Sequence, residues 1–239
     1  MIILNNMYMV EGLQKIFCVD GKEKKVFENL NLNIENDKVT IILGKSGCGK
    51  TTLLRIIAGL EKTTDGKVEF YNKNGEYIQP RIGMVFQESR LMPWLTVKEN
   101  IEIHKYKDDT ERYLKMVGLE EFRNAYPSQL SGGMAQRVSI ARALSYEPDT
   151  LLMDEPFSAL DYFTREQLQQ ELIKIYEKTR TGIIFVTHNI DEALMLGHRI
   201  IVINNGKISS YKIDKSYPRD IGDMELIGLK KQILNKING

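Results

Sequence analysis

The segment that most constrains this chain is Gly44–Thr51, which directly follows the apolar run Val39–Leu43. A glycine, four residues and then Gly-Lys-Thr is typical of a loop between a buried strand and a helix. Glycines let consecutive backbone N–H groups turn inward around phosphate oxygens, and the following helix directs its positive dipole end at the same place. A strand–helix turn without a ligand is the alternative, which the combined strand, spacing and Gly-Lys-Thr disfavour. The segment therefore predicts a nucleoside triphosphate site.

Residues of this loop are the predicted contacts of the nucleotide. Lys50 supplies a positive charge for the β- and γ-phosphates, and the Thr51 hydroxyl is a predicted ligand of Mg²⁺. Cys48 is a small side chain that the loop tolerates. The predicted nucleotide-binding residues of this segment are Gly44, Lys45, Ser46, Gly47, Cys48, Gly49, Lys50, Thr51 and Thr52.

Composition restricts the partners and the compartment. The chain has 33 Lys and Arg against 32 Asp and Glu, so no net field steers it toward nucleic acid or lipid. Cys18 and Cys48 form no metal-ligand pattern, which favours a reducing compartment. Met1–Val10 lacks the pattern of a signal peptide, and no apolar run approaches the ~18 residues that span a bilayer. We expect a cytoplasmic protein, with any membrane work done by another polypeptide.

Hydrophobic patterning predicts an α/β fold. Residues 7–34 indicate strands with a polar turn at 20–22, and 67–71 a further strand, which together predict a small antiparallel sheet. Short apolar runs that alternate with helical patterns predict a parallel sheet covered on both faces. These runs are 82–86, 150–153, 183–186 and 200–203.

The same patterning predicts the organisation of a single domain over 1–239. Residues 1–87 and 148–220 form a nucleotide-binding core with its β-subdomain. Residues 88–147 form a helical subdomain, and 221–239 a terminal amphipathic helix.

A second landmark is the pair of carboxylates at Asp154 and Glu155, which end the apolar run Leu151–Met153. Phosphoryl transfer with Mg²⁺ needs such groups at the carboxyl end of a strand. Asp154 is predicted to hold Mg²⁺ directly or through water, and Glu155 to orient or deprotonate the attacking water. Strands also end in acidic turns without chemistry, an alternative that the nearby phosphate loop disfavours.

A third landmark is Leu130–Gly133, in which Ser131 and two glycines begin a predicted helix. Such a helix start binds anions. One nucleotide needs only one such cradle, so a second one suggests a site completed by a second subunit. A plain serine-capped helix explains the same residues equally well.

Taken in order, these motifs resemble the ATP-binding-cassette ATPases. The resemblance spans nearly the whole chain, and Leu-Ser-Gly-Gly is far more specific than a phosphate loop. It implies a P-loop NTPase core with a parallel sheet, an antiparallel β-subdomain and an α-helical subdomain, and a Mg²⁺-dependent ATPase. The matching segments are Gly44–Thr51, Gln87, Leu130–Gly133, Asp154 and Glu155, Ser158–Asp161, and His188.

The resemblance implies a role for each matching residue. Gln87 contacts Mg²⁺ and the attacking water, while His188 holds the γ-phosphate and keeps Glu155 in register. Asp161 belongs to a loop that links the two sites of a dimer. The predicted catalytic residues are Glu155, His188, Gln87 and Lys50; the metal ligands are Thr51, Gln87 and Asp154; and the residues that bind the ATP of the opposite subunit are Ser131, Gly132 and Gly133.

Members of this family stack adenine on an aromatic residue of an early strand. Phe17 is the best positional match, and π-stacking gives the physical reason. The alternative is that Phe17 belongs to the core; Tyr8 is less well placed.

Three segments resemble the nitrate/sulfonate/taurine branch of importer ATPases: Val85–Val97, His188–Ala193 and Tyr217–Arg219. Related importers of other small organic solutes share the pattern. This resemblance implies an ATP-dependent homodimer on the cytoplasmic face of the membrane. It also implies a transmembrane permease and, through it, an extracytoplasmic substrate-binding protein. In such importers the groove beside the glutamine loop receives a permease helix, and Trp94 either lines it or packs within the helical subdomain.

The competing function is a soluble cassette ATPase that serves DNA repair or cofactor assembly. Near-zero net charge and the lack of a long coiled-coil insertion oppose the DNA version, so no nucleic acid is expected as a partner.

Overall fold

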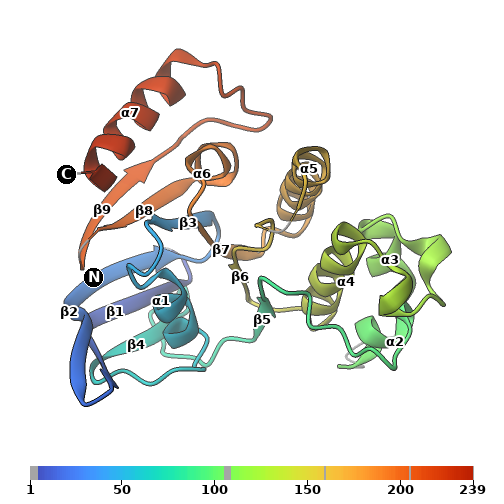
Figure 1. Cartoon of the computed structure of the whole chain (residues 1–239), viewed down its shortest axis with the longest axis horizontal. Coiled ribbons are helices and arrows are strands. Elements are labelled where there is room, and N and C mark those ends of the chain that lie inside the picture. The colour runs from blue at the N-terminus through green and yellow to red at the C-terminus, as the bar shows by residue number, and fades with distance from the viewer. Residues whose placement is uncertain (1–4, 105–108, 159, 205, 239) are drawn as a thin grey trace. The chain divides into compact units, whose positions relative to one another are not determined.

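The computed structural model describes residues 5–104, 109–158, 160–204 and 206–238, shown in Figure 1. The chain forms two compact units. The first unit comprises Met1–Gln79 with Gly182–Gly239, and the second comprises Pro80–Thr181. The predicted subdomain limits at 88–147 and 221–239 stay predictions.

An antiparallel sheet of the first unit consists of β1 (Met7–Val19), β2 (Lys22–Glu35) and β4 (Asp65–Tyr71), in the order β2-β1-β4. This confirms the small antiparallel sheet predicted from the sequence. On β2 the buried Leu30, Leu32 and Ile34 alternate with exposed asparagines. That period of two places one face of the strand in the core.

A second sheet in the first unit has the order β7-β3-β8-β9, in which β7 (Gly182–Thr187), β3 (Val39–Gly44) and β8 (Arg199–Asn204) are parallel. The strand β9 (Lys207–Lys212) pairs antiparallel to β8. All residues of β3 and β7 are buried, because helices cover a parallel sheet on both faces.

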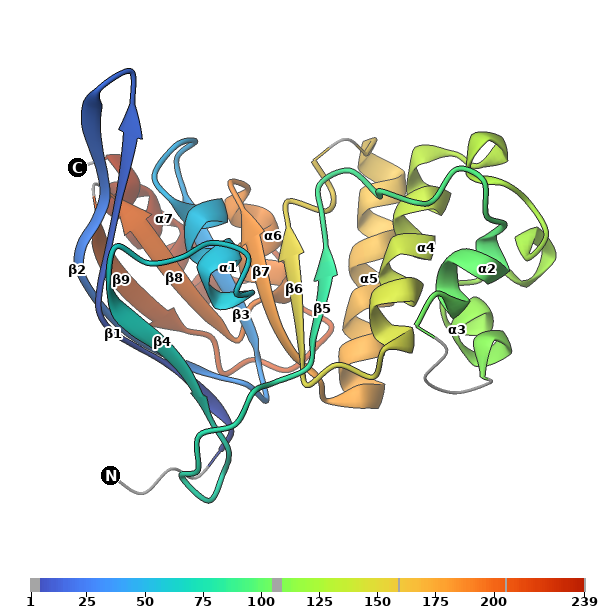
Figure 2. The same ribbon diagram turned by 90° about the horizontal axis from the view of Figure 1, so that it is seen from below.

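Three helices of the first unit follow these strands: α1 (Lys50–Ile57), α6 (Ile190–Leu196) and α7 (Met224–Asn238). Figures 1 and 2 show α1 on one face of the parallel strands and α6 on the other. Both helices contact β3 and β7, and α7 contacts α6 and β8. The predicted coverage of both faces is therefore confirmed.

The second unit pairs β5 (Ile82–Val85) in parallel with β6 (Thr150–Asp154). Its helices are α2 (Val97–Glu102), α3 (Thr110–Met116), α4 (Gly132–Ser145) and α5 (Tyr162–Thr179), with short 3₁₀ turns at Glu120–Phe122 and Pro127–Gln129.

The helix α4 is the centre of the second unit, because it contacts α2, α3, α5 and β5. Its buried side chains Val138, Ala141 and Leu144 recur at helical spacing. Within the described ranges, no helix combines the length and the apolar composition that crossing a membrane requires.

Candidate nucleotide site

The phosphate loop runs from the end of β3 to the start of α1, and two of its glycines are sterically required. A Cβ at Gly44 would lie 2.6 Å from the Cys48 Sγ and 2.6 Å from the Ile203 carbonyl oxygen. Gly49 has a φ of +104°, and a Cβ there would lie 2.6 Å from Val26 Cγ1. Neither position accepts a side chain, so the backbone itself forms the wall of the loop.

The start of α1 offers donors to an anion. Its N-cap residue Gly49 has no side chain to accept from the first turn, and that turn holds no acidic residue. No carboxylate of the first turn therefore competes with an anion for the positive end of this helix. Lys50 is buried, and its Nζ donates to the carbonyl oxygens of Gly44 at 3.0 Å and Lys45 at 3.1 Å. A helix start without acidic side chains, beside a buried ammonium, fits the phosphates of a nucleotide.

The structure brings His188 to the start of the phosphate loop. Leu43 and Thr187 are register partners on the neighbouring parallel strands β3 and β7. Gly44 and His188 follow these partners, so the loop and the histidine leave adjacent strands at the same level. The His188 side chain is exposed.

A hydrogen-bond network that the sequence analysis did not find holds the turn after His188. Asn189 caps α6, since its Oδ1 accepts from the N–H groups of Asp191 at 2.9 Å and Glu192 at 3.4 Å. The Thr187 hydroxyl accepts from the Asn189 N–H at 2.9 Å and donates to the buried Glu192 carboxylate at 2.5 Å. An asparagine before two acidic residues is a readable cap signal. The Thr187–Glu192 contact has no comparable signal in the sequence.

The two aromatic candidates for adenine on β1 differ in burial. Tyr8 belongs to the core, with its ring edge-on to Phe70 at 4.7 Å between centroids. Phe17 is half-buried, and Lys15 Nζ lies 4.5 Å from its ring centroid. The adenine contact of Phe17 stays a prediction.

In the second unit, Asp154 is the buried last residue of β6 and Glu155 begins the following turn. Glu155 has a φ of +44°, which is in the left-handed region. This conformation is unfavourable for any residue other than glycine. The Ser158 hydroxyl donates to the Glu155 carbonyl oxygen at 2.9 Å and so stabilises this turn. Ala159, in the predicted Ser158–Asp161 segment, lies outside the described residues.

The Leu-Ser-Gly-Gly segment begins α4. Ser131 is its N-cap, and the Ser131 Oγ accepts from the Met134 N–H at 3.2 Å. A Cβ at the buried Gly133 would lie 2.4 Å from Thr164 Cγ2, so this glycine allows α5 to approach. Ser131 and Gly132 are exposed. The serine cap is therefore present. Contact of Ser131–Gly133 with the ATP of a second subunit stays a prediction.

Gln87 is exposed and directly follows β5 and Phe86. The loop around it is anchored to α4, because Gln136 Nε2 donates to the Phe86 carbonyl oxygen at 3.1 Å. Arg142 donates to the carbonyl oxygens of Ser89 at 3.0 Å and Arg90 at 2.8 Å. These bonds hold the backbone on both sides of Gln87 and leave its side chain exposed.

The predicted site residues are thus distributed over both units. The first unit holds Phe17, Gly44–Thr52 and His188; the second holds Gln87, Ser131–Gly133, Asp154 and Glu155. In the described part of the chain, no group of three or more His, Cys, Asp or Glu residues could hold a metal by itself. The predicted Mg²⁺ ligands Thr51, Gln87 and Asp154 are instead mostly hydroxyl and amide oxygens, which suit this hard cation.

Comparison with known proteins shows the family of the chain. Residues 27–158 match the family model described as ABC transporter. The chain is 40% identical to the aliphatic sulfonates import ATP-binding protein SsuB of Bacillus cereus, covering 95% of this chain and 94% of that protein. It is 40% identical to the bicarbonate transport ATP-binding protein CmpD of Synechocystis sp., covering 88% and 80%.

A solved structure is also similar. The dimeric ATP-binding cassette MJ0796, in a post-hydrolysis state bound to ADP and Pi, matches with a TM-score of 0.74 and 35% identity. That match covers 87% of this chain and 100% of the other. With its phosphate loop, its Leu-Ser-Gly-Gly helix start and these relatives, the chain belongs to the ABC transporter family.

Proposed function

We propose that this protein is the ATP-hydrolysing subunit of an importer that takes up a small anionic solute through a separate permease. The observation that carries the proposal is the phosphate loop, with a helix start free of acidic side chains and the buried Lys50, in a chain that aligns almost throughout with a sulfonate import subunit. The similar proteins act on aliphatic sulfonates and bicarbonate, which are both small anions.

Each predicted site residue has a role in this proposal. The first turn of α1 and Lys50 bind the triphosphate, and His188 reaches the γ-phosphate from the neighbouring strand. Glu155 orients the attacking water and accepts its proton. Mg²⁺, held by Thr51, Gln87 and Asp154, neutralises negative charge on the phosphates when bound.

A second copy of the chain completes the site. Ser131 and Gly132 are exposed, so the start of α4 is accessible to a ligand bound by another copy of the chain. We place the ATP of the opposite copy there, so that two sites form when two copies close head to tail. The dimeric state of a similar cassette supports this arrangement.

The permease contact is proposed on the second unit, at a cavity of about 600 Å³ beside the loop that carries Gln87. The cavity is largely apolar, and a short amphipathic segment of the permease would fit it. Trp94, on the same loop, is 70% exposed, which opposes its packing within the helical subdomain. The lining includes Met84, Phe86, Met92, Ile103 and Tyr146. Through this contact the protein lies on the cytoplasmic face of the membrane, and the permease in turn receives a substrate-binding protein.

The test is recovery of partners from detergent extracts of cells that express the tagged full chain. Recovery with a multi-spanning membrane protein, lost in Met84→Arg but kept in the matched surface variant Lys231→Gln, supports the importer. Consistent recovery with a soluble scaffold in place of a membrane protein would overturn it in favour of cofactor assembly or repair.

A further inference from the structure

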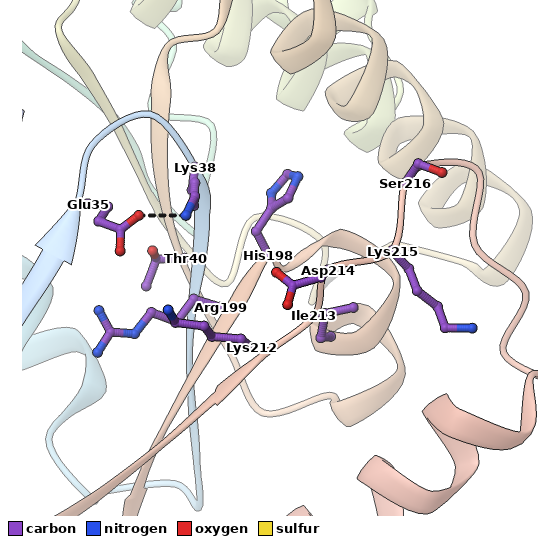
Figure 3. Close-up of a pocket in the computed structure, with 10 residues that line it drawn as sticks. All are labelled: Glu35, Lys38, Thr40, His198, Arg199, Lys212, Ile213, Asp214, Lys215 and Ser216. Atoms are coloured by element: carbon purple, nitrogen blue, oxygen red, sulfur yellow. Dashed lines mark hydrogen bonds and ion pairs between the residues drawn. The ribbon is translucent and has the colours of Figure 1, made fainter. Parts of the chain in front are cut away.

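A second cavity, of about 300 Å³, lies in the first unit and is shown in Figure 3. Its lining includes Thr40 near the start of β3 and Arg199 at the start of β8. The phosphate loop follows the opposite end of β3, after Gly44. The cavity therefore lies at the other end of the parallel strands from the nucleotide site, and nothing in the proposed ATPase cycle uses it.

Three polar side chains of this cavity occupy one row across three neighbouring strands. Thr40 on β3 is the register partner of Arg199 on β8, and Arg199 is the register partner of Lys212 on β9. Register partners direct their side chains to the same face of a sheet, and neighbouring strands are about 4.8 Å apart. A hydroxyl, a guanidinium and an ammonium thus follow one another along a single face.

The carboxylates around this row offset its positive charge only in part, because Glu35 interacts electrostatically with Arg199 and Lys212 without forming an ion pair with either. In the described part of the chain, no carboxylate forms an ion pair with Arg199 or Lys212. The Glu35 carboxylate pairs with Lys38 at 2.6 Å. Lys215 pairs outside the cavity lining, with Asp223 at 2.7 Å.

Arg199 is held in place but keeps donors to spare. Its Nε donates to the Ser210 Oγ at 2.8 Å, and its guanidinium also donates to the Asn33 carbonyl oxygen. A guanidinium has five N–H donors, so several remain for a ligand. Burial lowers the pKa of Arg199, and a bound anion would offset the desolvation that causes this.

Thr40 provides an independent sign of a ligand. Its side chain is 1% exposed, and among the described residues its Oγ1 has no hydrogen-bond partner. Buried hydroxyl groups are nearly always satisfied, because leaving one unpaired is unfavourable. Figure 3 shows Thr40 among the cavity residues with its hydroxyl toward Glu35 and Lys38. A ligand oxygen in the cavity would supply the missing partner.

We propose that this cavity is a binding site for a compact organic oxyanion, a carboxylate or a sulfonate. Arg199 and Lys212 hold its charged oxygens and Thr40 donates one hydrogen bond, while the buried Ile213 provides an apolar wall for a short carbon body. Asp214 also lines the cavity, which disfavours dianions. The site is independent of the transported solute and of ATP.

The experiment uses the full chain without nucleotide and measures its thermal unfolding midpoint against methanesulfonate and, separately, acetate. Sodium chloride at equal ionic strength is the reference. We expect a saturable rise of the midpoint with at least one organic anion, and the larger rise identifies the preferred head group. The rise should persist in Lys50→Ala, which weakens the phosphate loop as an anion site.

Two variants localise the effect. Thr40→Val removes the unpaired hydroxyl without changing the shape, so the ligand-free protein should unfold at the same or a higher temperature while anion affinity falls about tenfold. Lys212→Gln should weaken binding similarly, and Lys231→Gln, which removes a lysine outside the cavity, should not. An equal rise with chloride, its loss in Lys50→Ala, or undiminished binding in both Thr40→Val and Lys212→Gln would overturn the proposal.

Discussion

The hydroxyl of Thr187 donates a hydrogen bond of 2.5 Å to the carboxylate of Glu192, and both side chains are buried. Thr187 is the last residue of β7 and Glu192 lies in the first turn of α6. His188 lies between them in the chain, at the level where the phosphate loop begins. The bond therefore ties the strand to the helix on either side of the proposed catalytic histidine.

Thr187→Val tests whether this bond positions His188. Removing a hydrogen bond from a buried carboxylate should lower the free energy of unfolding by about 1–3 kcal/mol. We expect ATP turnover to fall several-fold with an unchanged Kd for ATP, because the histidine is displaced while the phosphate loop is kept. Unfolding, ATP binding and steady-state hydrolysis are measured. Thr179→Val, which loses a hydroxyl bond to the Ile175 carbonyl oxygen at 2.9 Å, is the control. Equal turnover in both variants would contradict the positioning role.

Glu155→Gln tests the general base. The amide cannot accept a proton from water, so turnover should fall by about 10²–10⁴-fold while ATP still binds. The ATP-bound dimer should accumulate, as measured by light scattering. Glu147→Gln is the matched control, because Glu147 also has a positive φ, of 47°. Normal turnover in Glu155→Gln would contradict the assignment of Glu155 as the general base.

Substitutions at Ser131 separate its capping role from its role in the dimer. Ser131→Ala should lower the free energy of unfolding by about 1 kcal/mol, because α4 loses its cap. Ser131→Asp keeps a good cap but places a negative charge against the proposed γ-phosphate of the opposite copy. In a Glu155→Gln background it should therefore remain stable yet fail to dimerise with ATP. Dimerisation of the aspartate variant would leave Ser131 as a cap only.

Phe17→Ala tests the proposed adenine contact. Loss of stacking should weaken ATP binding about 3- to 10-fold, while inorganic tripolyphosphate, which lacks the base, should bind as before. Phe17→Trp keeps an aromatic face and should retain the affinity for ATP. Calorimetry with both ligands decides the outcome. Equal weakening of ATP and tripolyphosphate would mean that the substitution disturbs β1 instead of a base contact.

Cys48 reports on occupancy of the phosphate loop. Burial raises the pKa of its thiol, and the positive charge of Lys50 only partly offsets this. A raised pKa means less thiolate at a given pH, so alkylation by iodoacetamide should be slow at pH 7 and increase steeply toward alkaline pH. ATP with Mg²⁺ should slow it further. Mass spectrometry measures the extent of alkylation of Cys48, with the exposed Cys18 as internal reference. Unchanged labelling of Cys48 with saturating ATP would place the nucleotide elsewhere.

Local patterns predicted much of the fold and the conformation of the phosphate loop. The loop at Gly44–Thr51 could be recognised because strand, glycines and helix start are consecutive, so their contacts are set by neighbours in the chain. The alternation of Leu30, Leu32 and Ile34 likewise reports one face of one strand. The difference in burial between Tyr8 and Phe17 could not be predicted. The burial of Tyr8 depends on the packing of β4, where Phe70 contacts it.

The sequence by itself determined that the chain binds a nucleoside triphosphate, that its core is a parallel α/β sheet and that it belongs with the cassette ATPases. Only the tertiary structure decided that Thr40, Arg199 and Lys212 form one row, and that Thr187 meets Glu192. The physical reason is register. The pattern of a strand predicts which of its own residues are buried. Which residues of the neighbouring strands lie beside them depends on pairing between segments far apart in the chain.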